Sequence, residues 1–166
     1  MADVTPDGSI AIPVFKLREM LARSATFQSE TGGDEDSARG RIFATDREFK
    51  DSFDRPRALI WVETHEYGFD SGGSANVLLG RGVLACYLER DVNELFAKDE
   101  WNAYLDACNW FGKCLDEVVA LSNRGDYVDV TGSGHLDIVT SESSNPVMET
   151  EQLEHPTIGQ YFYGSF

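Results

Sequence analysis

Residues 99–122 read DEWNAYLDACNWFGKCLDEVVALS and predict the long helix around which this chain folds. Their large apolar side chains recur at steps of three and four, the spacing of one helix face: Trp101, Tyr104, Leu105, Cys108, Phe111, Leu115, Val118 and Val119. A helix of this length spans on the order of 30 Å, about the width of a small domain. We therefore expect its aromatic residues Trp101, Tyr104 and Phe111 to pack on a sheet that contains strands 57–63 and 83–89.

The segments around this helix predict the rest of the domain. A shorter helix is expected over 14–24, after Pro13, and the alternating or apolar runs predict strands at 41–45, 57–67, 80–92, 135–141 and 158–166. The strands at 57–67 and 80–92 are joined by the glycine-rich segment 68–76 and should form an antiparallel hairpin. The segment 46–55 suits a helical turn, and the polar segments 25–40 and 142–157 are expected to be loops.

The order of these elements defines the fold class. Strands and helices do not alternate, so a doubly wound parallel sheet is not expected. The prediction is an α+β fold with a mixed or antiparallel β-sheet and with one short and one long helix packed on one face. Residues 1–166 should form a single domain with a flexible N-terminal arm at 1–11.

The composition limits the functions that the chain can have. Lysine and arginine total 14 against 29 acidic residues, which gives a formal charge of −15 and repels nucleic-acid phosphates. The N-terminus lacks the features of a signal peptide, and no apolar run is long enough to span a membrane. Three cysteines without metal or disulfide spacing fit a reducing cytoplasm, with Cys86 and Cys108 in the core and Cys114 partly exposed.

Motifs for catalysis or for metal binding are not found. The three histidines (His65, His135 and His155) stand apart, and segment 68–76 matches neither a nucleophile elbow nor a phosphate loop. The acidic groups at 34–36 and at Asp126, Asp129 and Asp137 lack calcium-loop spacing, so we interpret them as solvated loop charge. The sequence therefore predicts no catalytic residue, no metal and no cofactor, and a protein that is not an enzyme.

Large apolar side chains on the second face of the predicted sheet indicate self-assembly. Two helices fill only one face, which leaves Trp61, Tyr87, Tyr161 and Tyr163 on the other. An antiparallel sheet with an apolar second face usually meets another layer, often another subunit. These four residues are the candidate subunit interface. The alternative is that loops 25–40 and 142–157 fold over this face.

The order of segments resembles that of phage tail terminator (tail completion) proteins, the lambda-like ring-forming subunits that cap a tail tube. The resemblance covers most of residues 12–166: the helix IPVFKLREMLARSATF, the strands PRALIWVE and RGVLACYLERDV, the helix WNAYLDACNWFGKCLDEVVALS and the aromatic strand GQYFYGSF. It is a pattern of elements and not a signature motif. The chain departs from the family in its long acidic segments at 28–40 and 142–157.

The resemblance implies a virion structural protein at the head–tail (neck) interface. It implies a ring of identical subunits, a homohexamer, that stops tail-tube growth, contacts the tail tube, the sheath and the head–tail connector, and lets genome DNA pass through its lumen without specific binding. Assembly would take place in the host cytoplasm, with no membrane involved. An acidic lumen would let DNA slide, and the acidic segments are expected to contribute to it. Another neck or tail-tube subunit, a small α+β enzyme and an acidic DNA-mimic inhibitor stay as alternatives.

Overall fold

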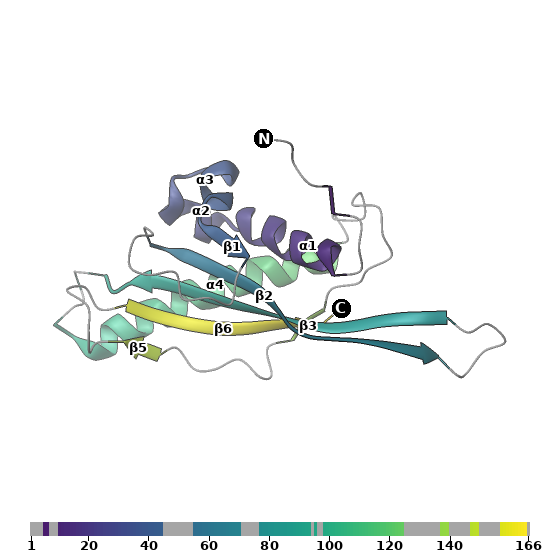
Figure 1. Ribbon diagram of the computed structural model, residues 1–166. Helices are drawn as coiled ribbons and strands as arrows, with labels where there is room; N and C mark the ends of the chain where they lie inside the picture. Colours follow the sequence, from purple (N-terminus) through teal and green to yellow (C-terminus); the bar gives the residue numbers. More distant parts are fainter. Residues whose placement is uncertain are drawn as a thin grey trace.

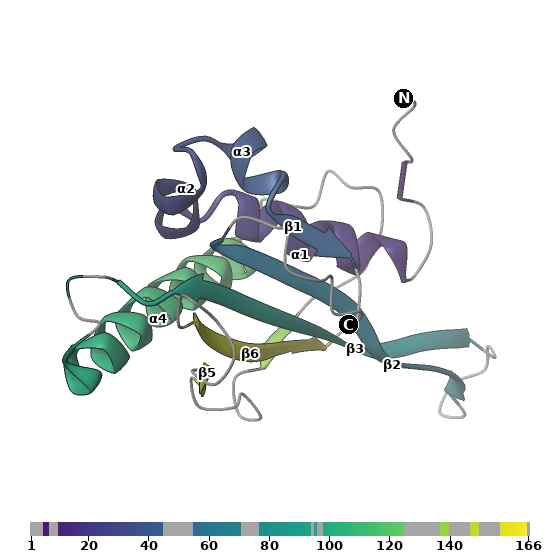
Figure 2. The same ribbon diagram turned by 60° about the vertical axis from the view of Figure 1, so that its left-hand side comes forward.

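The computed structural model has an α+β architecture in which helices cover one side of a mixed sheet (Figures 1 and 2). It describes residues 5–6, 10–44, 55–70, 77–93, 95, 98–124, 137–139, 147–149 and 157–165. The described helices are α1 (Ala11–Ala22), α2 (Ala25–Thr31), α3 (Glu35–Arg39) and α4 (Glu100–Arg124), and the described strands are β1 (Ile42–Ala44), β2 (Arg57–Asp70), β3 (Val77–Asp91), β4 (Asp137–Val139), β5 (Val147–Glu149) and β6 (Thr157–Ser165). The predicted fold class is confirmed.

The sheet has six strands in the order β1-β2-β3-β6-β4, and β5 also pairs with β6. β1 runs parallel to β2, whereas all the other pairs are antiparallel, so the sheet is mixed. The hairpin of β2 and β3 is confirmed, and it is longer than predicted because the strands continue to Asp70 and start again at Val77. A register shift between Val62 and Thr64 marks the place where this hairpin leaves the rest of the sheet.

Alternate residues of the central strands form a dry core beneath the helices. Ala58, Ile60, Leu84, Cys86 and Phe162 are all buried, and they belong to one cluster with residues of α1, α2, α3 and α4. Because side chains alternate along a strand, the residues between these positions point to the other side of the sheet. The helices therefore account for one face only.

The prediction that 25–40 is a loop is wrong, because this segment contains α2 and α3. Ser24 caps α2 by accepting a hydrogen bond from the Phe27 backbone at 3.1 Å, and Asp34 caps α3 by accepting one from the Ser37 backbone at 2.8 Å. Such side-chain caps satisfy donors that a short helix would otherwise leave free. Between the helices, Gly32 has φ 126°, a conformation that glycine adopts without strain.

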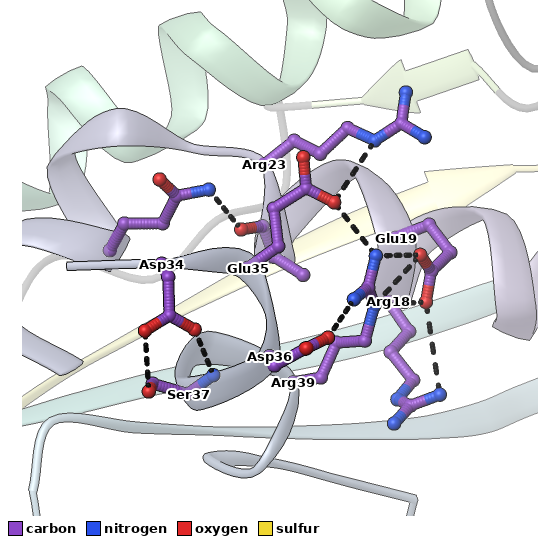
Figure 3. Close-up of polar contacts among 10 residues, drawn as sticks. Arg18, Glu19, Arg23, Asp34, Glu35, Asp36, Ser37 and Arg39 are labelled. Atoms are coloured by element: carbon purple, nitrogen blue, oxygen red, sulfur yellow. Dashed lines mark hydrogen bonds and ion pairs between the residues drawn. The ribbon is translucent and has the colours of Figure 1, made fainter. Parts of the chain in front are cut away.

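The acidic residues of α3 lie on a helix and are paired, so their interpretation as loop charge is wrong, although the Asp36 side chain is 93% exposed and is solvated as predicted. Arg39 binds Glu19 of α1 at 2.9 Å, and it also binds its helix neighbours Glu35 at 2.8 Å and Asp36 at 2.6 Å (Figure 3). Glu19 is only 8% exposed, so this cluster lies partly inside the fold. Arg39 thus fastens α3 onto α1. The same contacts reduce the negative charge that 28–40 could offer to a lumen.

The predicted core stripe of α4 is partly wrong. Phe111 and Val118 are buried as expected, but Trp101 is 70% exposed and Leu105 is 45% exposed. The residues that face the core are instead Ala103, Ala107, Trp110, Phe111, Cys114 and Val118. The helix is apolar over a wide arc, and its small alanines allow the close approach to the sheet that Trp101 would prevent.

Because α4 faces the sheet with a different side than predicted, two of the cysteine predictions are also wrong. Cys86 is buried as expected, but Cys108 is only half-buried and Cys114 is completely buried. Burial raises the pKa of the Cys114 thiol to about 12, although a hydrogen bond with Ser24 opposes that shift. Burial also raises the pKa of Cys86 well above its ordinary value. Both buried thiols stay protonated at neutral pH.

The remaining predictions differ from the structure in smaller ways. Segment 142–157 was expected to be a loop, but it holds the short strand β5, which pairs with β6 through Met148 and Ile158. A strand of three residues leaves little pattern in a sequence, so its partner decides its conformation. The predicted turn at 46–55 lies outside the described residues except for Arg55, as do His135, His155, Asp126 and Asp129.

Candidate subunit interface

The four predicted interface residues lie together on the side of the sheet that faces away from the helices. The register of the three central strands places them in adjacent rows. One row is Leu59–Tyr87–Tyr161, and the next is Trp61–Ala85–Tyr163. Leu59, Trp61, Tyr87, Tyr161 and Tyr163 are all half-buried. We refer to these five residues as the aromatic face.

Three rings of the aromatic face, those of Trp61, Tyr87 and Tyr161, are in contact. Tyr87 and Tyr161 have ring centroids 4.5 Å apart, and Trp61 meets the edge of Tyr161 at 6.1 Å. Ala85 is fully buried between the larger side chains of its row. Aromatic pairs of this geometry stabilise a sheet beyond the area that they bury. The result is a preformed apolar surface with polar phenol groups.

Gly159 completes this surface, and the sequence analysis missed its role. A Cβ atom at Gly159 would collide with the ring and hydroxyl of Tyr87, so the Tyr87 ring lies over the glycine. Only glycine allows the tyrosine to lie flat across β6 in this way. The glycine within the aromatic strand was visible in the sequence, but its neighbour Tyr87 could be identified only from the strand register.

A buried ion cluster borders the aromatic face. In the next row, Glu89 lies between Arg57 and Gly159, and its side chain is only 5% exposed. It accepts hydrogen bonds from Arg57 and, at 3.0 Å, from Arg55, whose other end lies 3.6 Å from Asp91. A carboxylate this deeply buried requires such partners. The sequence analysis missed this cluster because Arg55 and Glu89 are 34 residues apart.

The β2–β3 hairpin extends beyond the rest of the sheet as an arm (Figure 1). β6 pairs with β3 only at 83–91, and β1 pairs with β2 only at Ala58–Ile60. Within the described part of the chain, the segments 65–70 and 77–82 therefore pair only with each other. A two-stranded ribbon is marginally stable by itself, and the edge of a sheet is a place where another strand can pair. Such an arm is suited to binding a neighbouring chain.

A pocket of about 400 Å³ lies between α2, α4 and β3 on the helix-covered side. Arg90 is 8% exposed, lies 3.4 Å from Glu30 and 3.2 Å from Asp106, and stacks 5.3 Å from the centre of the Trp110 ring. Burial raises the pKa of Glu30, Arg90 opposes that shift and Asp106 adds to it. Arg90 thus joins two helices to a strand.

The two hydroxyl groups that line the pocket are already engaged. Thr26 donates its hydroxyl to Glu117 at 2.7 Å, and Ser29 donates its hydroxyl to the Thr26 carbonyl at 2.7 Å. Neither is next to a histidine among the lining residues. A nucleophile needs an adjacent base to be activated. We therefore assign no reaction to this pocket.

The described residues contain no group of three or more metal-ligating side chains placed to hold an ion. Within the same residues, no helix has both the length and the hydropathy to cross a membrane. Comparison of the chain with protein-family models and with curated proteins finds no match. The candidate interface accordingly depends on its geometry alone.

Proposed function

We propose that this protein is a ring-forming virion subunit, a tail terminator at the head–tail interface of a phage. The observation that carries the proposal is the aromatic face, which lies on the side of the sheet that the described helices leave uncovered (Figures 1 and 2). The side chains of this face are half-buried in the single chain, and a contiguous apolar surface that solvent still reaches is typical of an interaction surface. In the proposed ring, each subunit buries this face against its neighbour.

The hairpin arm supports a head-to-tail arrangement. A ring requires two different surfaces on each subunit, because the contact surface of one copy meets a different surface of the next. The arm (65–70 with 77–82) offers backbone edges at one end of the sheet, and the aromatic face lies over β2, β3 and β6. An arm that reaches a neighbouring sheet would add strands by backbone hydrogen bonding.

The charge of the chain fits the passage of DNA through such a ring. At a formal charge of −15, carboxylates near the lumen would repel phosphates and prevent adhesion. The pairing of Glu35 and Asp36 with Arg39 makes segment 28–40 a weaker contributor than the total charge suggests. The ring would cap the tail tube, end its growth and join it to the head connector. It would act as a structural component, without catalysis.

Electron microscopy and native mass spectrometry of the purified 18.5 kDa chain test this proposal. We expect rings of uniform diameter with the mass of a small integral number of subunits, six in the homohexamer. Tyr161→Lys should abolish the rings, since it places a charge among the aromatic side chains. Ser29→Lys, an exposed position on α2, is the matched control and should keep them. A strict monomer, both alone and mixed with tail tubes, would refute the proposal.

A further inference from the structure

α4 carries a second apolar stripe beside the one that faces the core. Its residues follow one another at steps of four, three, four, three and four, the spacing of a coiled-coil seam: Trp101, Leu105, Cys108, Gly112, Leu115 and Val119. Trp101 is 70% exposed, Leu105 is 45% exposed and Gly112 is exposed, while the other three are half-buried. We refer to these six residues as the outer stripe.

The outer stripe holds a large share of the exposed apolar side chains. In the described part of the chain, the exposed large hydrophobic residues are Ile10, Leu95, Trp101 and Leu105. Two of these four are neighbours on the outer stripe, one helical turn apart. Single exposed hydrophobic residues are ordinary on protein surfaces, but a continuous row at seam spacing indicates a partner helix.

The spacing of the outer stripe is the same when it is read from either end. A second α4, laid antiparallel over the first with its centre at Trp110, places Trp101 opposite Val119. In the same register, Leu105 lies opposite Leu115. Cys108 then lies opposite Gly112. The rows pair tryptophan with valine, leucine with leucine and cysteine with glycine. Pairing a large side chain with a smaller one lets helix surfaces interlock. A parallel pair would instead stack Trp101 on Trp101 and leave a gap at Gly112.

Gly112 is the least expected residue of this helix. Glycine in the middle of a helix costs about 1 kcal/mol relative to alanine. A Cβ atom built at Gly112 meets nothing within 4 Å, so the fold of the single chain does not require glycine there. A helix that packs from outside would explain it, because a small residue lets two helix axes approach closely. This makes a second helix the occupant that the stripe fits.

We propose that the outer stripe of α4 binds the same stripe of a second copy, in an antiparallel pair about a two-fold axis. Such an interface is self-complementary, as a two-fold contact must be. The association of two copies depends on protein concentration, so it can be measured by dilution. The aromatic face takes no part in it. The inference therefore stands independently of the proposed ring.

Analytical ultracentrifugation over a range of concentrations tests the contact. We expect the full-length protein to associate in pairs, and Leu105→Glu to weaken this association at least tenfold. Asn102→Glu adds the same charge at an exposed position of α4 that is not on the stripe, and it should leave the association unchanged. A wild-type protein that shows no pairing, or equal effects of the two variants, would refute the proposal.

Disulfide trapping tests the register and does not depend on how Leu105→Glu folds. Oxidation of Gly112→Cys with diamide should give a covalent dimer, since the introduced thiol faces Cys108 of the other copy. Lys113→Cys, one residue away and off the stripe, should give none. Wild-type protein that cross-links through Cys108 as fast as Gly112→Cys, or a Gly112→Cys variant that stays uncross-linked, would overturn the antiparallel register. Repeating the trapping with Tyr161→Lys separates this contact from the ring, because cross-linking should persist when rings are absent.

Discussion

The two sides of the sheet are both apolar in sequence, yet they differ in burial and in the kind of residue they carry. On the helix-covered side, Ile60, Cys86 and Phe162 are at most 1% exposed. Their neighbours on the other side, such as Trp61 and Tyr161, are half-buried. The covered side uses residues without polar atoms or with only a thiol, whereas four of the five residues of the aromatic face are rings with a polar group. Amphipathic rings can lie in water in the free subunit and in an interface after assembly.

The largest expected difference between the two sides concerns adjacent residues of β6. Phe162→Ala should lower the free energy of unfolding by about 3–5 kcal/mol, because it leaves a cavity under the helices. Tyr161→Ala should lower it by only about 1–2 kcal/mol, since this ring already contacts solvent. Urea denaturation of both variants measures the difference. Equal losses would mean that the open side is as well packed as the core.

The ion cluster should be the most sensitive polar feature of the open side. Glu89→Gln should destabilise the protein by about 2–3 kcal/mol, because two arginines that are 12% and 19% exposed lose their charged partner. Glu63→Gln is the control, an exposed position that accepts a hydrogen bond from Trp61, and it should cost less than about 0.5 kcal/mol. Thermal denaturation compares the two variants. If Glu63→Gln lost as much stability as Glu89→Gln, burial of the ion cluster would not explain the loss.

On the covered side, Glu117 should give a smaller effect that depends on pH. It accepts hydrogen bonds from Ser24 at 2.6 Å and from Thr26 at 2.7 Å and 3.0 Å, which fastens α2 to α4. Burial raises the pKa of Glu117, but these hydrogen bonds outweigh it, and the pKa lies below the ordinary 4.5. Glu117→Gln should therefore cost about 1–2 kcal/mol at neutral pH.

The pH dependence of this effect has a definite sign. A carboxylate whose pKa is lowered by folding stabilises the native state above its unfolded pKa and loses that contribution as the pH falls through its folded pKa. The stability gap between wild type and Glu117→Gln should narrow as the pH is lowered below about 4.5. Denaturation at pH 7 and pH 3.5 measures the gap. A gap that stays constant would show that the charge of Glu117 contributes nothing.

The smallest expected effect is on the outer stripe of α4. Trp101→Ala should change the free energy of unfolding of the monomer by less than about 0.5 kcal/mol, because the side chain is 70% exposed. Phe111→Ala on the same helix should cost about 3–5 kcal/mol, since Phe111 is 4% exposed. Measurements at low protein concentration keep association out of the comparison. A large loss from Trp101→Ala would place Trp101 in the core after all.

Much of the fold could be predicted from the sequence, and the errors have a common cause. Apolar residues at steps of three and four located α1 and α4, and strand alternation located the hairpin of β2 and β3. The same patterns could not choose which of two apolar arcs of α4 faces the sheet, so Trp101 was predicted to lie in the core and Trp110, which does lie there, was not predicted. α2 and α3 were missed because single capping residues, Ser24 and Asp34, begin helices that are too short to show a period.

The candidate interface also has a part that the sequence predicted and a part that it did not. Trp61, Tyr87, Tyr161 and Tyr163 were predicted to share a face because strand alternation is local, and the structure places them together. Gly159 and the Arg55–Glu89–Arg57 cluster were not predicted, since each depends on which strands are neighbours and on their register. No local pattern carries that information.

The sequence by itself determined the class of fold, the charge and the presence of more apolar surface than two helices can cover. These properties follow from composition and from local periodicity, which do not depend on how distant parts of the chain pack together. Only the tertiary structure decided which arc of α4 is dry, which carboxylates are paired and which rings meet across strands. Those outcomes depend on contacts between residues far apart in the chain, and close packing admits only one of the arrangements that the local patterns allow.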